Sequence, residues 1–150
     1  NPHWRSFDEG KPQLVVFPGP HCYISPSWYE SEKAVPTWNY ATAHVYGVPQ
    51  VINNPDDAYA GQKALVDLHE SRFEVPWQME EVDADFIDGM LRAIVSFEIP
   101  IDRVECKFKL SQNRPLADRK RVVDALEQSG KSADGSVAGL MREVGVLEEE

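Results

Sequence analysis

The stretch TWNYATAHVY, residues 37–46, indicates the fold class. One face carries large or polar side chains and the other carries small apolar ones: Trp38, Tyr40, Thr42, His44 and Tyr46 against Ala41, Ala43 and Val45. A repeat of two residues is that of a β-strand with two different faces. Gly47-Val48-Pro49 then ends the strand, and we expect residues 50–52 to return as a hairpin arm.

The residues before this stretch also favour β structure. Gln13 to Phe17 is a short, largely apolar run, and Pro18-Gly19-Pro20 after it is a strong turn signal. His21 to Ile24 follows, and Ser25-Pro26 ends it. We therefore predict two short strands separated by a turn.

Helices and a strand pair are predicted after residue 53. Asn54-Pro55-Asp56-Asp57 begins a helix with a cap, a proline in the first turn and two acids, and Ala58, Gly61, Leu65 and Leu68 form its predicted inward stripe. Residues 83–92 favour a short acidic helix. Residues 95–101 and 104–110 alternate and predict an antiparallel pair, and two amphipathic helices follow, the first ending at Gly130.

The order of these elements predicts an α+β, mainly β fold in one domain, residues 1–150. Its parts are a β-rich segment at 1–53, a helical insert at 54–92, a strand pair at 94–110 and a helical tail at 113–147.

Composition excludes several classes of protein. The chain has 150 residues, of which 42% are hydrophobic and 27% charged, which is typical of a globular domain. Its net charge of −10 argues against direct DNA binding, and no apolar run approaches membrane-spanning length. The two cysteines, Cys22 and Cys106, are far apart, which favours a reducing, cytoplasmic setting.

The charge is unevenly distributed. Residues 102–121 hold seven cations and three acids, a net +4, which leaves −14 for the rest of the chain. Within this island, Lys109, Ser111, Gln112, Asn113 and Arg114 lie where a strand passes into a helix and suit the phosphate of a small ligand. The alternatives are solvated strand and helix faces, with Ser111 or Asn113 acting only as a helix cap.

A second candidate group surrounds the start of the central strand. Lys33 precedes Thr37, Trp38 and Asn39, so a cation and an amide lie close to ring side chains. Trp38 and Tyr40 suit a flat ring, and Asn39 suits the edge of a heterocycle. The alternative is an ordinary aromatic strand in the core.

The sequence gives little support to a catalytic cysteine, a metal site, or a nucleotide-binding or serine-hydrolase motif. His21 and Cys22 are neighbours in a strand and therefore point to opposite faces, which argues against a thiolate–imidazole pair. The four histidines have no metal-ligand spacing. The motifs GxGxxG, GxxxxGK[ST] and GxSxG do not occur.

Four segments of the chain resemble the PaiB family, a group of FMN-binding proteins described as negative transcriptional regulators. These are residues 1–5 (NPHWR), 19–29 (GPHCYISPSWY), Lys33 with 35–40 (VPTWNY), and 107–114 (KFKLSQNR). The resemblance spans essentially all 150 residues. Cys22 departs from the family pattern, in which a small residue such as alanine stands there.

The resemblance implies an antiparallel, Greek-key split β-barrel with C-terminal helices, related to pyridoxamine-phosphate oxidase. It implies a homodimer with FMN at the subunit interface. The match begins partway into the family pattern, so the barrel is expected to be incomplete at its N-terminus. The predicted FMN-binding residues are Lys33, Thr37, Trp38, Asn39, Lys109, Ser111, Gln112, Asn113 and Arg114.

Two functions remain open at this point. The first is an FMN-binding PaiB-type negative transcriptional regulator that acts as a dimer without binding DNA directly. The second is a flavin-dependent oxidoreductase or a haem-handling enzyme on the same barrel, in which the cofactor carries the redox chemistry.

Overall fold

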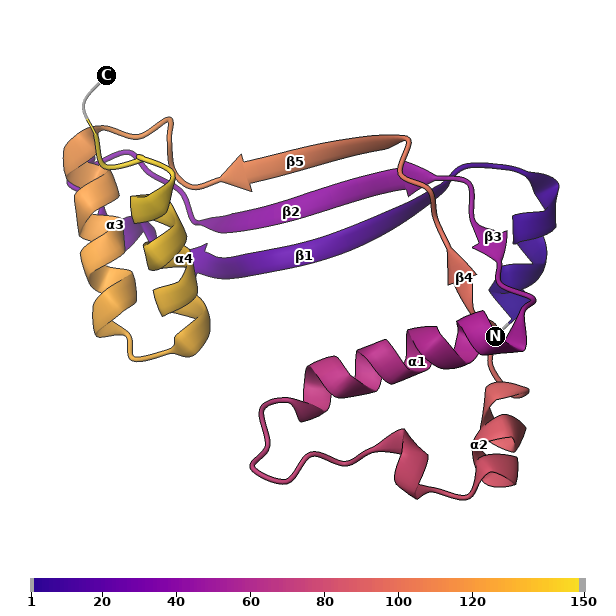
Figure 1. Ribbon diagram of the computed structural model, residues 1–150. Helices are drawn as coiled ribbons and strands as arrows, with labels where there is room; N and C mark the ends of the chain where they lie inside the picture. The colour runs from indigo at the N-terminus through magenta and orange to yellow at the C-terminus, as the bar shows by residue number, and fades with distance from the viewer. Residues whose placement is uncertain (1, 149–150) are drawn as a thin grey trace. The chain divides into compact units, whose positions relative to one another are not determined.

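The computed structural model describes residues 2–148, so Asn1 of the first matching segment lies outside it. The chain forms two units (Figure 1). Unit 1 comprises residues 1–13 and 46–102, and unit 2 comprises residues 14–45 and 103–150. Each unit is described by itself below.

Unit 2 contains a three-stranded sheet in the order β1-β2-β5. Its strands are β1 (Gln13–Ile24), β2 (Thr37–Gly47) and β5 (Arg103–Lys109). Neighbouring strands run in opposite directions (Figure 1). The alternating stretch at 37–46 is thus the central strand of the sheet, as its two-faced pattern predicts.

The prediction of a turn at Pro18-Gly19-Pro20 is wrong, because β1 runs through these residues without a break. Within residues 2–148, β1 has a neighbour on one side only, and an edge strand tolerates prolines because an outward-facing N–H group is not needed for the ladder. Gly19 allows a close approach to β2: a Cβ atom there would lie 3.1 Å from the carbonyl oxygen of Ala41.

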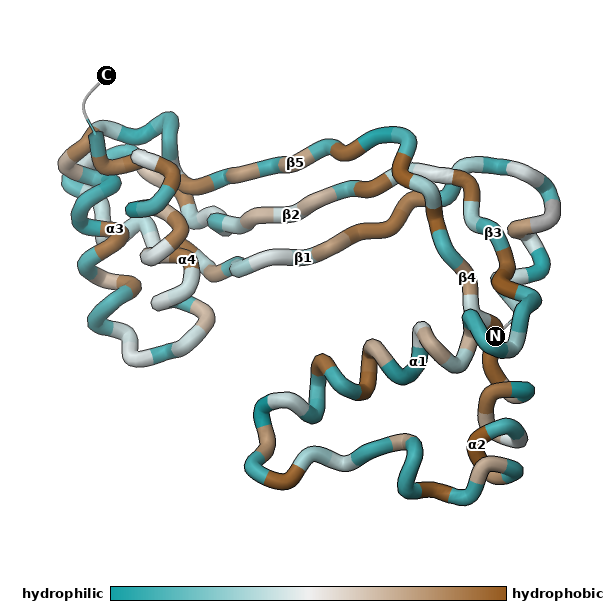
Figure 2. Tube along the Cα trace, in the orientation of Figure 1, coloured by the Kyte–Doolittle hydropathy of each residue, from teal (hydrophilic) through white to brown (hydrophobic). Residues whose placement is uncertain are grey.

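Two helices follow the sheet of unit 2: α3 (Leu116–Gln128) and α4 (Ser132–Glu143). Gly130 separates them with a φ of +68°, a conformation that suits glycine after a helix end. Figure 2 shows hydrophobic and hydrophilic residues alternating along α3. The hydrophobic residues pack against the end of β1 and form one core cluster: Cys22, Ile24, Tyr29, Leu110, Val122, Val123, Leu126, Val137, Ala138, Met141 and Val146.

The loop between β1 and β2 is fixed to α3. It contains the short 3₁₀ helix η2 (Pro26–Trp28), which Ser25 caps through its side chain. Asp118, 1% exposed, accepts a 2.7 Å hydrogen bond from the backbone N–H of Glu30 and a 2.6 Å bond from the hydroxyl of Ser31. Burial alone would raise the pKa of the Asp118 carboxyl. The bonds from Ser31 and from the backbone of Glu30 and Ser31, with the charge of Arg114, lower that pKa below its usual value.

Unit 1 contains a small antiparallel ladder between β3 (Gln50–Val51) and β4 (Phe97–Glu98). Gln50 lies opposite Glu98, and Val51 lies opposite Phe97. The predicted pairing of residues 95–101 with 104–110 is therefore wrong, and so is the return of residues 50–52 onto the strand before them. β4 pairs with β3, while β5 joins the separate sheet of unit 2.

Helices α1 (Pro55–Glu70) and α2 (Ala84–Leu91) form near their predicted positions in unit 1. Asn54 caps α1 through a 3.0 Å bond from the N–H of Asp56, and Asp83 caps α2 through a 3.0 Å bond from the N–H of Phe86. The predicted inward stripe of α1 is wrong: Leu65 and Leu68 are 49% and 71% exposed, and no residue of α1 is buried. Unit 1 is completed by two 3₁₀ helices, η1 (Pro2–Glu9) and η3 (Met79–Glu81).

The architecture is α+β with antiparallel sheets, as predicted. Between residues 2 and 148 the strands form one three-stranded and one two-stranded sheet, and neither closes into a barrel.

Candidate functional site

A hollow of about 210 Å³ forms in unit 2 where the start of β2 meets the segment that follows β5. It is lined by Tyr29, Val35, Pro36, Thr37, Asn39, Lys109, Ser111, Asn113 and Arg114. Six of the nine predicted site residues are among them, although they come from segments some 70 positions apart. No carboxylate is among the lining residues, so the hollow combines two cations with neutral polar groups.

Lys109 joins the two segments. Its Nζ donates a hydrogen bond to the hydroxyl of Thr37 and a 2.9 Å bond to the carbonyl oxygen of Trp38. Both acceptors are uncharged, and Lys109 forms no salt bridge within residues 2–148. Its positive charge is therefore held in place and remains available to an anion.

Arg114 forms the other cationic wall. Its guanidinium carbon lies 4.5 Å from the centre of the Tyr29 ring, which is the geometry of a cation–π contact. Arg114 has no salt bridge in the part of the chain that the structure describes, although it attracts the buried carboxylate of Asp118. The flat guanidinium group suits a phosphate or carboxylate.

A buried polar pair shapes the floor of the hollow. The Asn39 amide donates a 3.0 Å hydrogen bond to the Ser111 hydroxyl, and that hydroxyl lies 3.1 Å from the Asn39 carbonyl oxygen. Asn39 is 0% exposed and Ser111 is 5% exposed. Ser111 has a φ of +65°, the left-handed conformation that side chains other than glycine rarely adopt. This turn directs the chain from β5 back toward the hollow, and Arg114 continues it through a 2.9 Å bond from its N–H to the Ser111 carbonyl.

Gln112 stabilises the same turn and does not line the hollow. Its side-chain oxygen accepts a 2.7 Å bond from the N–H of Leu110, and its amide donates a 2.8 Å bond to the carbonyl of Phe108. Lys33 is exposed and also lies outside the lining.

The ring of Trp38 lines a different hollow, of about 370 Å³, together with Pro18, Gly19, His21, Tyr40, Ala41 and Thr42. The ring centre lies 6.2 Å from those of both His21 and Tyr23. Trp38 therefore reaches the cationic hollow through its backbone carbonyl alone, while its ring belongs to an apolar depression on the sheet.

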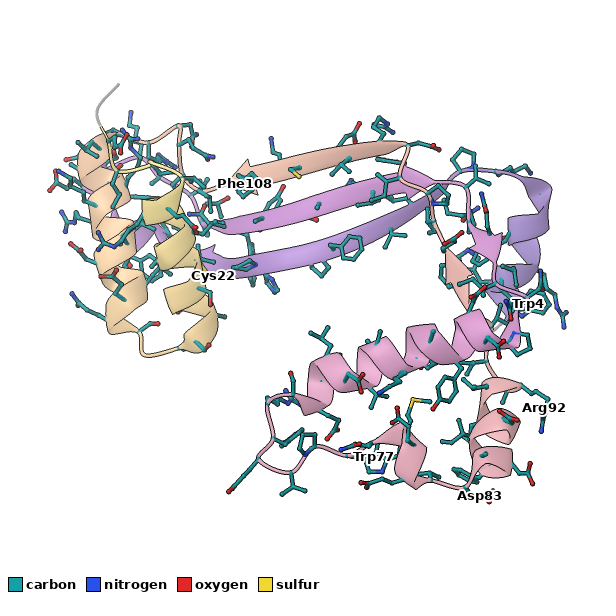
Figure 3. The ribbon with its side chains drawn as sticks, in the orientation of Figure 1. Trp4, Cys22, Trp77, Asp83, Arg92 and Phe108 are labelled. Atoms are coloured by element: carbon teal, nitrogen blue, oxygen red, sulfur yellow. The ribbon has the colours of Figure 1, made fainter. Side chains whose placement is uncertain are left out.

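Cys22 and His21 lie in the different surroundings that their strand positions predict. Cys22 is 4% exposed at the end of β1 beside α4 (Figure 3), whereas His21 is exposed. Burial, with a contribution from Asp134, raises the pKa of the Cys22 thiol to about 11. The thiol is therefore protonated near neutral pH and is a poor nucleophile.

The largest hollow described in the molecule lies in unit 1 and holds none of the predicted site residues. It measures about 630 Å³ and is bordered by Trp4 and by the ends of α1 and α2 near Asp56 and Arg92. Within residues 2–148, no group of three or more histidine, cysteine or acidic side chains is placed to hold a metal ion.

Two residues that shape the cationic hollow, one in its lining and one behind it, were not predicted from the sequence. Tyr29 lines it and supports Arg114, and Asp118 fixes the loop that carries Tyr29. Tyr29 is part of a stretch rich in aromatic and proline residues, but nothing local in the sequence connects it to Arg114. Asp118 has the sequence signature of an ordinary first-turn helix acid.

Comparisons with known proteins identify the family of the chain. A family model described as "Putative FMN-binding domain" matches residues 1–103. The Bacillus subtilis protein named protease synthase and sporulation protein PAI 2 is 33% identical over 143 residues, which cover 95% of this chain and 68% of that protein. An uncharacterized protein of Emericella nidulans is 32% identical over 151 aligned positions, covering 91% of this chain and 60% of the fungal protein.

A second fungal protein, an uncharacterized one from Aspergillus fumigatus, is 25% identical over 156 aligned positions, with the same two coverages of 91% and 60%. The chain thus spans about two thirds of the length of the curated relatives that it matches. The family model covers more than half of the chain, and the bacterial relative is similar along nearly all of it. The chain belongs to the PaiB family of FMN-binding proteins.

Proposed function

We propose that this chain binds FMN with the phosphate of the cofactor in the cationic hollow of unit 2. The observation that carries this proposal is the lining itself: Lys109 and Arg114 face one small space that contains no carboxylate. The hydroxyl groups of Thr37 and Ser111 and the amide of Asn113 border the same space. Two cations with neutral donors are the usual partners of a phosphate dianion.

The size of the hollow suits one end of the cofactor. Sites for whole cofactors and drug-sized ligands usually measure about 300–1,000 Å³, and this hollow measures about 210 Å³. It therefore suits the phosphate end, while the ring system needs walls from elsewhere. Lys33 and Trp38, which do not line the hollow, are proposed to contact the ribityl chain or the ring. When bound, FMN supplies a planar group that can take up and release electrons.

We infer that a second copy of the chain supplies part of those walls. The sheet of unit 2 carries large hydrophobic side chains that are 44–56% exposed: Leu14, Val16, Phe17, Tyr23, Trp38, Val104 and Phe108. Exposed apolar groups of this number mark interaction surfaces. They support a homodimer in which each half contributes strands to a Greek-key split barrel. Light scattering on the purified chain tests this proposal, and a monomer at micromolar concentration contradicts it.

We also propose that the protein acts as a negative transcriptional regulator without contacting DNA itself. Unit 1 carries fourteen Asp and Glu residues against five Lys and Arg residues, which opposes binding to a polyanion. Salt-dependent binding of the chain to promoter DNA would contradict the proposal. Oxidation of NADH or NADPH by the FMN-loaded protein would instead support the alternative, a flavin-dependent oxidoreductase.

The decisive experiment is a flavin titration of the full chain followed by fluorescence. We expect the wild-type chain to bind FMN, and Lys109→Ala and Arg114→Ala each to weaken binding by about tenfold or more, because each removes a charged hydrogen-bond donor. Lys107→Ala is the matched control, since Lys107 is an exposed lysine of β5 outside the hollow. A wild-type chain that binds no FMN, or equal losses in all three variants, contradicts the proposal.

A further inference from the structure

The hydroxyl group of Tyr29 is buried and has no hydrogen-bond partner. Tyr29 is 7% exposed, and its hydroxyl is one of two buried side-chain polar atoms without a partner within residues 2–148. A buried, unpaired hydroxyl costs free energy, and folded proteins retain few of them. Such a group in the wall of a binding site indicates that its partner is a ligand atom.

The surroundings of Tyr29 define the chemistry of that partner. Tyr29 lines the hollow with Lys109 and Arg114. Three other polar groups of the lining already have partners: the Thr37 hydroxyl accepts from Lys109, and the Asn39 amide is paired with the Ser111 hydroxyl. The hydroxyl of a tyrosine that lines a hollow with two cations and no carboxylate suits a negatively charged oxygen.

Tyr29 is also held firmly in place. Its N–H donates a 3.2 Å bond to the carbonyl oxygen of Pro26, and the next two residues, Glu30 and Ser31, are both bonded to the Asp118 carboxylate. The phenol therefore stands on a fixed support before any ligand arrives, so little conformational freedom is lost when it makes a hydrogen bond.

Arg114 contacts the Tyr29 ring and lines the same hollow. The hydroxyl itself is closed off from solvent, so contact with a ligand requires a local movement. Arg114 lies over the Tyr29 ring and has no salt bridge in the described part of the chain. With no salt bridge to break, it is the side chain of the hollow that can move from the ring toward an incoming anion.

We propose that the Tyr29 hydroxyl donates a hydrogen bond to a phosphate oxygen of the ligand and makes the site select a phosphomonoester over the same molecule without phosphate. This inference rests on the proposed binding of FMN and adds to it a residue that determines specificity. No bond is made or broken covalently. Tyr29 acts as a neutral donor, and Lys109 and Arg114 supply the charge.

Tyr29→Phe tests the proposal, because it removes the hydroxyl and keeps the ring under Arg114. In fluorescence titrations of the full chain we expect the dissociation constant for FMN to rise about tenfold, and that for riboflavin, which lacks the phosphate, to stay unchanged. Without ligand, the melting temperature should be equal to or above that of the wild type, since no hydrogen bond is lost. Tyr59→Phe, in α1 of unit 1, is the matched control and should change neither affinity.

Unchanged FMN affinity in Tyr29→Phe overturns the inference, and so does an equal loss for FMN and riboflavin. Failure of the proposed function is recognised separately with inorganic phosphate as the probe. If the wild-type chain binds no FMN but phosphate raises its melting temperature more than that of Tyr29→Phe, the phosphate contact stands and FMN binding is wrong. If phosphate stabilises both proteins equally or neither of them, the contact is wrong as well.

Discussion

The helices of the two units differ in how far they are buried. In unit 2, α3 and α4 contribute seven buried residues, among them Val122, Leu126 and Met141. In unit 1, neither α1 nor α2 contains a buried residue, although both carry large hydrophobic side chains such as Leu68 and Phe86. An apolar stripe on a helix thus shows that a face is available for packing, and it does not show that the face is covered within the same chain.

The unit with the buried helices is also the one that holds the proposed binding site. The cationic hollow borders the well-packed core of unit 2, and Tyr29 belongs to both. A rigid core gives binding groups fixed positions, which reduces the entropy lost when the ligand binds. Unit 1, to which the open helices belong, carries fourteen of the 25 acidic residues of the chain.

The largest difference in stability between the two units should appear when one leucine in each is replaced by alanine. Leu126 is 0% exposed in the core of unit 2, and Leu68 is 71% exposed on α1. We expect Leu126→Ala to lower the free energy of unfolding by about 2–5 kcal/mol, because it leaves a cavity, and Leu68→Ala to change it by about 0.5 kcal/mol or less. Urea unfolding followed by circular dichroism measures both. Similar effects of the two substitutions would show that α1 is packed as tightly as α3.

Replacing the buried carboxylate of Asp118 should have an intermediate effect on stability. Asp118→Asn removes a charge that accepts two short hydrogen bonds, and should cost about 1.5–3 kcal/mol at pH 7. Because the pKa of Asp118 is lowered in the folded chain, its stabilisation is complete above the unfolded-state pKa of about 4 and is lost as the pH falls through the folded-state pKa.

The stability difference between wild type and Asp118→Asn should therefore be constant near neutral pH and narrow below about pH 4. Thermal unfolding across this pH range measures it. Asp88→Asn, on the exposed surface of α2, is the control and should stay within about 0.5 kcal/mol of the wild type. A difference that persists unchanged at low pH would mean that Asp118 acts without its charge.

The smallest effects on stability are expected from two glycine substitutions, and these effects should have opposite signs. Gly130 in unit 2 has a φ of +68°, and Gly130→Ala should destabilise by about 1–2 kcal/mol, because a side chain is strained in that conformation. Gly61 lies inside α1, where an added Cβ meets nothing within 4 Å, and Gly61→Ala should stabilise by about 0.5–1 kcal/mol. Melting temperatures compare the two. A loss of stability in Gly61→Ala would reveal a contact on the open face of α1.

Local patterns in the sequence predict much of the fold. The alternation at residues 37–46 corresponds to β2, and the cap at Asn54 and the stop at Gly130 mark real helix ends. Strand partners were predicted wrongly, because pairing depends on residues distant in the sequence. β4 and β5 are neighbours along the chain and still enter different sheets. The turn expected at Pro18 and Pro20 does not form, because the effect of a proline depends on whether its strand lies at an edge.

Only part of the candidate site could be predicted, again because the rest depends on contacts between residues distant in the sequence. Charge and residue type select Lys109 and Arg114, and the family resemblance adds Thr37; the structure places all three around one hollow. The alternation of the strand already places the side chains of Trp38 and Asn39 on opposite faces, and the structure accordingly puts Trp38 in a different hollow from Asn39. Tyr29 and Asp118 act through a contact between α3 and a loop almost ninety positions earlier, which no local pattern contains.

The prolines of β1 have a consequence for how the chain behaves at high concentration. Leu14 to Phe17 is an exposed, strongly apolar run on an edge strand, the kind of segment that recruits other chains into fibrils. Directly after it, Pro18 and Pro20 deny a foreign strand the N–H groups that a continuous ladder needs. Proline ordinarily disrupts a sheet. Here the two prolines prevent further strands from adding to the free edge of β1.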